Sequence, residues 1–149
     1  MSDETYQGML EFLRSHKRIH LHGAVPCTPW SVIQHLNEYL HGMTFRRKLH
    51  KARLLSLKMI AVFLKLAREV KQAGSTVSLE WPKKATGWDK PSVQQLIREI
   101  GLQTVIVDGC AVGVKARTGE PMLKPWRIET DCLTPVSYTH LTLPTNREV

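Results

Sequence analysis

The sequence predicts an α/β fold: a Rossmann-like partial parallel sheet with flanking helices and a C-terminal β-hairpin. First, segments with the apolar pattern of strands alternate with segments of helical periodicity, an order typical of parallel βαβ units. Second, a glycine follows most of the predicted helices, as a helix stop does. Third, 149 residues with 42% hydrophobic and 23% charged content suit one ordinary globular domain.

The first half of the chain contains one predicted strand and three predicted helices. Apolar residues at helical spacing indicate a helix over 3–15. The alternation over 18–25 indicates a strand that places His20 and His22 on one face. A proline-rich break at 26–31 is followed by a helix that runs to about His41 and stops at Gly42. Residues 45–73 then form a long helix, whose apolar stripe is Ala52, Leu55, Met59, Val62, Phe63, Leu66 and Val70.

The second half adds two strands, one helix and a hairpin. Residues 76–80 are a short buried strand, ended by Trp81 and Pro82. Asp89 is expected to cap a helix that begins at Pro91 and stops at Gly101. Residues 103–107 are an apolar strand, and 111–115 and 122–130 are the two hairpin arms. We expect the strands at 19–25, 76–80 and 103–107 to share one sheet, with the first two parallel and adjacent.

The net charge of +8 is concentrated in one segment. Residues 44–72 contain nine lysines or arginines and one acid, Glu69. Such a block suits a polyanion, so DNA is the expected partner, although a solvated helix face gives the same pattern. The residues expected to contact nucleic acid here are Arg47, Lys51, Lys58 and Lys65, the three lysines being spaced seven apart.

The sequence does not indicate a disulfide-rich secreted protein, a membrane protein or a zinc protein. Three cysteines at scattered positions do not describe a disulfide framework, and no signal peptide or membrane-length apolar run is present. We therefore expect an intracellular protein, cytoplasmic or nuclear, that is not secreted and has no membrane partner. The histidines and cysteines lack the spacing of a zinc site, so no metal is expected.

Two loops follow predicted parallel strands, at the edge where open α/β sheets bind ligands. The first reads Pro-Cys-Thr-Pro-Trp-Ser over 26–31, and the second contains Glu80-Trp81-Pro82. The first loop resembles the nucleophile loop of the cytosine-5 DNA methyltransferases, which reads Pro-Cys-Gln-Pro-aromatic-Ser. In that family the next strand ends in Glu-Asn-Val, of which only Glu80 is retained here. The resemblance covers about residues 19–130 and is specific mainly at the cysteine loop.

The resemblance implies two catalytic residues, Cys27 and Glu80. A thiolate adds to carbon 6 of cytosine, and a carboxyl group holds the edge of the flipped base. Because Cys27 precedes a predicted helix near Pro29, the helix dipole is expected to favour its thiolate. The cofactor of the intact family is S-adenosylmethionine. A glycine-rich donor loop is absent, since the first 17 residues contain only Gly8. We therefore expect a fragment that lacks the N-terminal half of the fold, binds no cofactor and is inactive alone, so enzyme status stays open.

Three further segments of the sequence carry expectations about function and domain boundaries. Arg127, in Lys-Pro-Trp-Arg, loosely matches the family's Gln-X-Arg-X-Arg strand and joins the nucleic-acid-binding set. Segments around Glu80, Gly109 and Arg127 also resemble domains of retroelement-associated, copia-like polyproteins. The alternative function is therefore a non-catalytic nucleic-acid-binding module of such a polyprotein. Residues 136–145 resemble a translated sequencing adapter, so we expect a domain over 1–135 and a disordered artefactual tail over 136–149.

Overall fold

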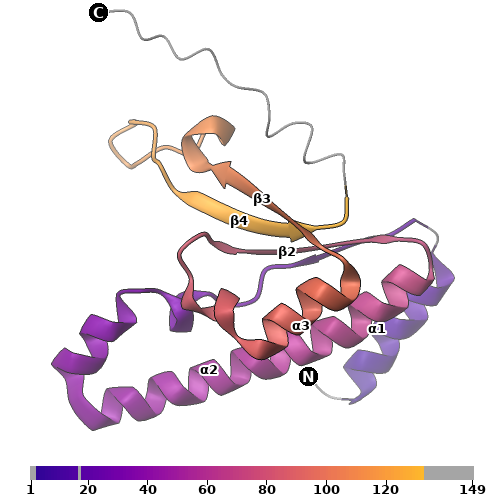
Figure 1. Ribbon diagram of the computed structural model, residues 1–149, viewed down its shortest axis with the longest axis horizontal. Coiled ribbons are helices and arrows are strands. Elements are labelled where there is room, and N and C mark those ends of the chain that lie inside the picture. Colours follow the sequence, from indigo (N-terminus) through magenta and orange to yellow (C-terminus); the bar gives the residue numbers. More distant parts are fainter. Residues whose placement is uncertain (1–2, 17, 133–149) are drawn as a thin grey trace, which may run out of the picture.

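The protein is described by a computed structural model that covers residues 3–16 and 18–132 (Figure 1). The expected tail at 136–149 lies outside the described residues. Within these described residues ten elements follow one another: α1 (Asp3–Ser15), β1 (His20–Gly23), η1 (Thr28–Trp30), α2 (Gln34–Gln72), β2 (Thr76–Pro82), η2 (Thr86–Asp89), α3 (Pro91–Ile100), β3 (Gln103–Asp108), η3 (Gly109–Val112) and β4 (Pro125–Thr130).

The four strands form one mixed sheet in the order β1-β2-β4-β3. β1 and β2 are parallel neighbours, with Leu21 opposite Val77, as predicted. The third predicted strand, β3, lies in the same sheet and runs in the direction of β2. It is separated from β2 by β4, which is antiparallel to both. The fold is therefore the predicted α/β class, a partial Rossmann-like sheet with flanking helices, and Figure 1 shows these helices on one side of the sheet.

The C-terminal hairpin differs from the prediction in its first arm. The strands that pair with β4 are β2 and β3, whereas residues 109–112 of the predicted first arm form a 3-10 turn. Among the described residues, one isolated bridge, Lys115 to Pro121, and the hydrogen bond from the Met122 N–H to the Val114 carbonyl join this region, without forming a ladder of strands. Proline has no N–H to donate, which hinders a longer ladder at this bridge. The apolar strand 103–108 offers β4 a full register of six residue pairs instead.

A kink at Gly42 divides α2, where the sequence predicted two helices. The φ and ψ angles of Gly42 are 65° and −159°, a region open almost only to glycine. The segment before the kink extends away from the sheet (Figure 1). Its apolar side chains are therefore largely exposed, and Tyr39 reaches 81% exposure. The apolar pattern predicted this short helix correctly, but Leu36, Tyr39 and Leu40 stay exposed because this segment points away from the core.

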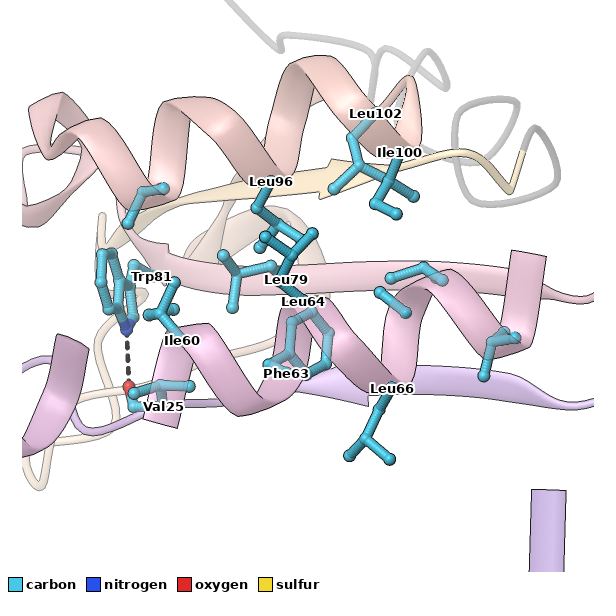
Figure 2. Close-up of a cluster of buried hydrophobic side chains, with 14 of the residues drawn as sticks. Val25, Ile60, Phe63, Leu64, Leu66, Leu79, Trp81, Leu96, Ile100 and Leu102 are labelled. Carbon is cyan, nitrogen blue, oxygen red and sulfur yellow. Dashed lines mark hydrogen bonds between the residues drawn. The ribbon is translucent and has the colours of Figure 1, made fainter. Parts of the chain in front are cut away.

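The main core lies between the sheet and the helices α2 and α3 (Figure 2). The apolar stripe predicted for α2 is partly wrong, because Leu55 and Met59 are 61% and 41% exposed. This helix carries apolar residues around much of its circumference, so its periodicity did not identify the face that meets the sheet. The residues that α2, β2 and α3 contribute to this hydrophobic core are Ile60, Phe63, Leu64, Leu66, Ala67, Val70, Val77, Leu79, Trp81, Val93, Leu96 and Ile100.

Helix α3 begins and ends close to the predicted positions. Gly101 adopts the left-handed conformation (φ 74°) and ends the helix. The start differs, since the N-cap residue is Lys90, with no side-chain cap, and Asp89 belongs to the preceding 3-10 turn. Pro91 at the first helical position fixes a φ suited to the helix, which is sufficient to begin it here.

Candidate functional site

Cys27 and Glu80 line one cavity of about 280 Å³. Because β1 and β2 are parallel neighbours, the segments at their carboxyl ends meet at one edge of the sheet. Cys27 lies just beyond β1, and Glu80 lies near the end of β2. The structure therefore brings the two predicted catalytic residues to the same cleft. Lys124 and Trp126, which precede and begin β4, complete its far wall.

The cysteine loop is anchored by a buried tryptophan. Trp30 is 2% exposed, and its Nε1–H donates to Ser56 Oγ on α2 at 2.8 Å. The backbone N–H of Trp30 donates to the Cys27 carbonyl at 2.9 Å, which closes the 3-10 turn. Gly87 packs against the same indole, where a Cβ atom would lie 2.8 Å from the Trp30 ring. The aromatic residue of the loop motif thus fixes the backbone that presents Cys27.

The expected help of a helix dipole to Cys27 is not found. Cys27 is the N-cap of η1, a 3-10 turn of three residues, and α2 begins only at Gln34. The macrodipole arises from aligned peptide units over several turns, so one short turn supplies little of it. The prediction was wrong because the prolines that signalled a helix start begin a 3-10 turn instead.

Glu80 sits within β2 rather than after it, since the strand continues through Pro82. Its side chain is 34% exposed, and its Oε2 lies 3.7 Å from Nε2 of His22 on β1. Glu80 is paired in register with Ile128 of β4. β4 pairs with Glu80 itself and β1 pairs with β2 up to the preceding residue, Leu79, so the carboxylate is presented from a rigid element.

A second cavity, of about 370 Å³, adjoins the first. The two share Cys27, Thr28, Pro82 and Lys124, and the second adds Lys84 and Gln34. Sequence reasoning did not assign roles to Lys84 or Lys124. Their placement depends on the pairing of Pro82 with Trp126 between β2 and β4, which no local pattern in the sequence reveals.

The predicted nucleic-acid-binding residues of α2 are exposed. Three of the nine cations over 44–72 pair with acids elsewhere in the fold: Arg53 with Glu38, Arg68 with Glu99, and Lys71 with Asp131. The hydrogen bond from Arg68 holds the pKa of Glu99 below its usual range, and Glu99 raises that of Arg68. Among the described residues, the six other cations have no carboxylate within ion-pair distance: Arg46, Arg47, Lys48, Lys51, Lys58 and Lys65.

Arg127 differs from the other predicted nucleic-acid contacts because its charge is compensated inside the fold. Its Nε donates to Glu129 Oε1 at 2.6 Å, and its guanidinium lies 4.6 Å from the centre of the Trp88 ring. Glu129 is fully buried and also accepts from Thr104. Arg127 is thus paired with a buried carboxylate, unlike the free cations of α2, and its contact with nucleic acid stays a prediction.

The comparisons with known proteins add no family or relative. No family model, no curated protein and no solved structure matches the chain. Within the described part of the chain, no helix has the length and apolar content to cross a membrane. The same residues contain no group of three or more histidine, cysteine, aspartate or glutamate side chains placed to hold a metal ion.

Proposed function

We propose that this protein is a methyltransferase-like nucleic-acid-binding domain whose cleft accepts a single base of DNA between Cys27 and Glu80. The supporting observation is that these two residues, 53 positions apart in the sequence, line one cavity at the carboxyl ends of two parallel strands. A carboxylate can accept hydrogen bonds from the ring edge of a base, and an aromatic wall such as Trp126 can contact its face.

The electrostatics of the cleft suit a nucleotide. Lys84 and Lys124 line the second cavity, whose lining among the described residues includes no acidic side chain. Phosphate groups of a bound strand would meet these lysines, while the base would meet Glu80 in the first cavity. The phosphates of the ligand would then lie against the lysines, and the hydrogen-bond donors of its base would lie against the Glu80 carboxylate. These two contacts would orient the ligand as well as bind it.

We propose no methyl transfer by this chain alone. Methyl transfer requires a donor held about 3–3.5 Å from the acceptor carbon, and positioning supplies much of the rate. The chain offers no glycine-rich loop of the family type to hold S-adenosylmethionine. An assay with labelled donor and cytosine-containing DNA should therefore give no incorporation, with or without Cys27→Ser. Incorporation that Cys27→Ser abolishes would contradict this part of the proposal.

The binding test compares a short single-stranded oligonucleotide containing cytosine with the same strand made abasic at that cytosine. Fluorescence anisotropy should give a Kd for the cytosine strand that Glu80→Gln raises roughly tenfold, the effect of losing one charge-assisted hydrogen bond. For the abasic strand, Glu80→Gln should change little. Glu120→Gln, in an exposed turn, is the control for the change in charge. Equal effects of Glu80→Gln on both strands would contradict a base in the cleft.

A second candidate function is a non-catalytic nucleic-acid-binding module, as in the polyproteins that the sequence resembles. The six exposed cations of α2 without carboxylate partners favour it. In this case binding depends on phosphates alone, and Kd for the cytosine and abasic strands should be equal. The anisotropy experiment therefore separates the two functions in one titration.

A further inference from the structure

His20, Ser78 and His22 form a continuous hydrogen-bonded chain on the side of the sheet opposite the helices. Ser78 Oγ lies 2.8 Å from His20 Nε2 and 2.7 Å from His22 Nδ1. At one end, His20 Nδ1 lies 2.7 Å from Thr76 Oγ1. At the other end, His22 Nε2 faces Glu80 Oε2 at 3.7 Å. The parallel register of β1 and β2 sets these contacts, because His20 pairs with Thr76 and His22 with Ser78.

The number of hydrogens on these side chains limits the directions that the hydrogen bonds between His20, Ser78 and His22 can take. A hydroxyl has one hydrogen, and a neutral imidazole has one N–H and one acceptor nitrogen. Ser78 can therefore donate to only one of the two rings and must accept from the other. Glu80 selects the direction, because a carboxylate attracts an N–H and repels a nitrogen lone pair. In the neutral chain His22 then carries its hydrogen on Nε2, Ser78 donates to His22, and His20 donates from Nε2 to Ser78.

Adding one proton to His22 reverses the three hydrogen bonds among His22, Ser78, His20 and Thr76, and leaves the His22 Nε2–H directed at Glu80. His22 Nδ1 becomes a donor to Ser78, Ser78 donates to His20 Nε2, and His20 moves its hydrogen to Nδ1 and donates to Thr76. We propose that this chain is a one-proton site, with the charge on His22 beside Glu80, and that His20 changes tautomer when His22 is protonated. The number of protons balances, because one proton enters from solvent, His22 gains one positive charge and the His20 ring stays neutral.

A second proton is disfavoured by both geometry and charge. With two cationic rings, Ser78 would meet two N–H donors, and its own hydrogen would lose its acceptor. The ring centres are only 6.5 Å apart, so the two charges would repel. Among the described residues, Glu80 is the one carboxylate within 4.0 Å of either ring. Asp131, at the end of β4, is held by Lys71 and the Val77 N–H instead.

Protonation of this chain would change the charge beside the cleft. Glu80 lines the cavity, and a cationic His22 would offset its negative charge. An anionic ligand in the cleft should therefore bind more readily when His22 is cationic than when it is neutral. This effect of His22 protonation applies to any anionic ligand of the cleft, and not to nucleic acid alone.

The test follows ring nitrogens by NMR in the full chain labelled with ¹⁵N-histidine, as pH falls from about 8 to about 4.5. We expect His22 to become imidazolium first, while the protonated nitrogen of His20 changes from Nε2 to Nδ1 in the same step. His20 should gain its second proton only in a separate step at lower pH. Joint protonation of both rings in one step, without a tautomer change, would overturn the proposal. His50, exposed on α2, is the internal reference.

Two variants test the parts of the hydrogen-bonded series His20, Ser78 and His22 separately. Ser78→Ala removes the bridging hydroxyl, so the two rings should titrate independently and His20 should keep one tautomer. Glu80→Gln leaves the bridge intact but removes the carboxylate that favours charge on His22, so the proton should be shared with His20. If both variants reproduce the wild-type titration, the proposal is wrong. Far-UV circular dichroism of each variant establishes that the fold is retained.

Discussion

The indole Nε1–H of Trp81 donates to the main-chain carbonyl oxygen of Val25 at 2.6 Å, and both residues are buried (Figure 2). This bond joins β2 to the segment between β1 and Cys27. It therefore fixes the distance between the two walls of the cleft, since Trp81 is the neighbour of Glu80 and Val25 lies two residues before Cys27.

Removing this bond should destabilise the fold. Trp81→Phe keeps an aromatic ring but leaves the buried Val25 carbonyl without its partner, which costs about 1–3 kcal/mol. The free energy of unfolding from urea titration measures the loss. The control is Trp126→Phe, at a half-buried ring, for which we expect a smaller change. A Trp81→Phe protein as stable as the wild type would show that the bond does not hold the loop.

Gly42 offers a test of the kink in α2. An L-residue at φ 65° and ψ −159° is strained by about 1–3 kcal/mol, so Gly42→Ala should lower the free energy of unfolding by that amount. Gly8→Ala, within α1 with open space around its Cβ position, should instead stabilise by about 0.5–1 kcal/mol. If Gly42→Ala stabilises the protein as Gly8→Ala does, α2 is a straight helix in solution.

The charge of α2 predicts strongly salt-dependent binding. Changing Lys51, Lys58 and Lys65 together to glutamate should abolish binding to single-stranded DNA, because each phosphate contact releases counterions. The slope of log Kd against log salt, measured by anisotropy, should be steep in the wild type. Arg98, Lys115 and Arg117 are exposed outside α2, and their triple change to glutamate is the control with the same total charge. Equal losses in both variants would mean that net charge, rather than α2, governs binding.

The pair formed by Arg68 and Glu99 predicts a dependence of stability on pH. The pKa of Glu99 is lowered mainly by the hydrogen bond from Arg68. A carboxylate whose folded pKa is lowered stabilises the fold above its unfolded value, about 4.3, and loses this effect as pH falls through the folded value. Glu99→Gln should therefore lose less stability than the wild type between pH 7 and pH 3 in urea titrations. Because the pair is exposed, the difference should be small. A wild-type loss no larger than that of Glu99→Gln would contradict the pairing.

The sequence predicted the fold class and most elements, because helix periodicity, strand alternation and glycine stops are local signals. It also predicted that Cys27 and Glu80 meet, since parallel neighbouring strands end at one edge. It did not predict the place of β4 between β2 and β3, which depends on long-range pairing. For the same reason Lys84, Lys124 and the compensated charge of Arg127 became evident only in the folded chain.

Alkylation of Cys27 with neutral iodoacetamide, followed by mass spectrometry, is the most direct test that the cleft holds a base. With saturating cytosine-containing single strand, the rate at Cys27 should fall several-fold, while the rate at exposed Cys110 stays constant as an internal control. The same strand, abasic at the cytosine, should protect Cys27 much less at equal saturation. An unchanged rate at Cys27 under saturating cytosine strand would contradict the account, because the bound nucleic acid would then lie outside the cleft.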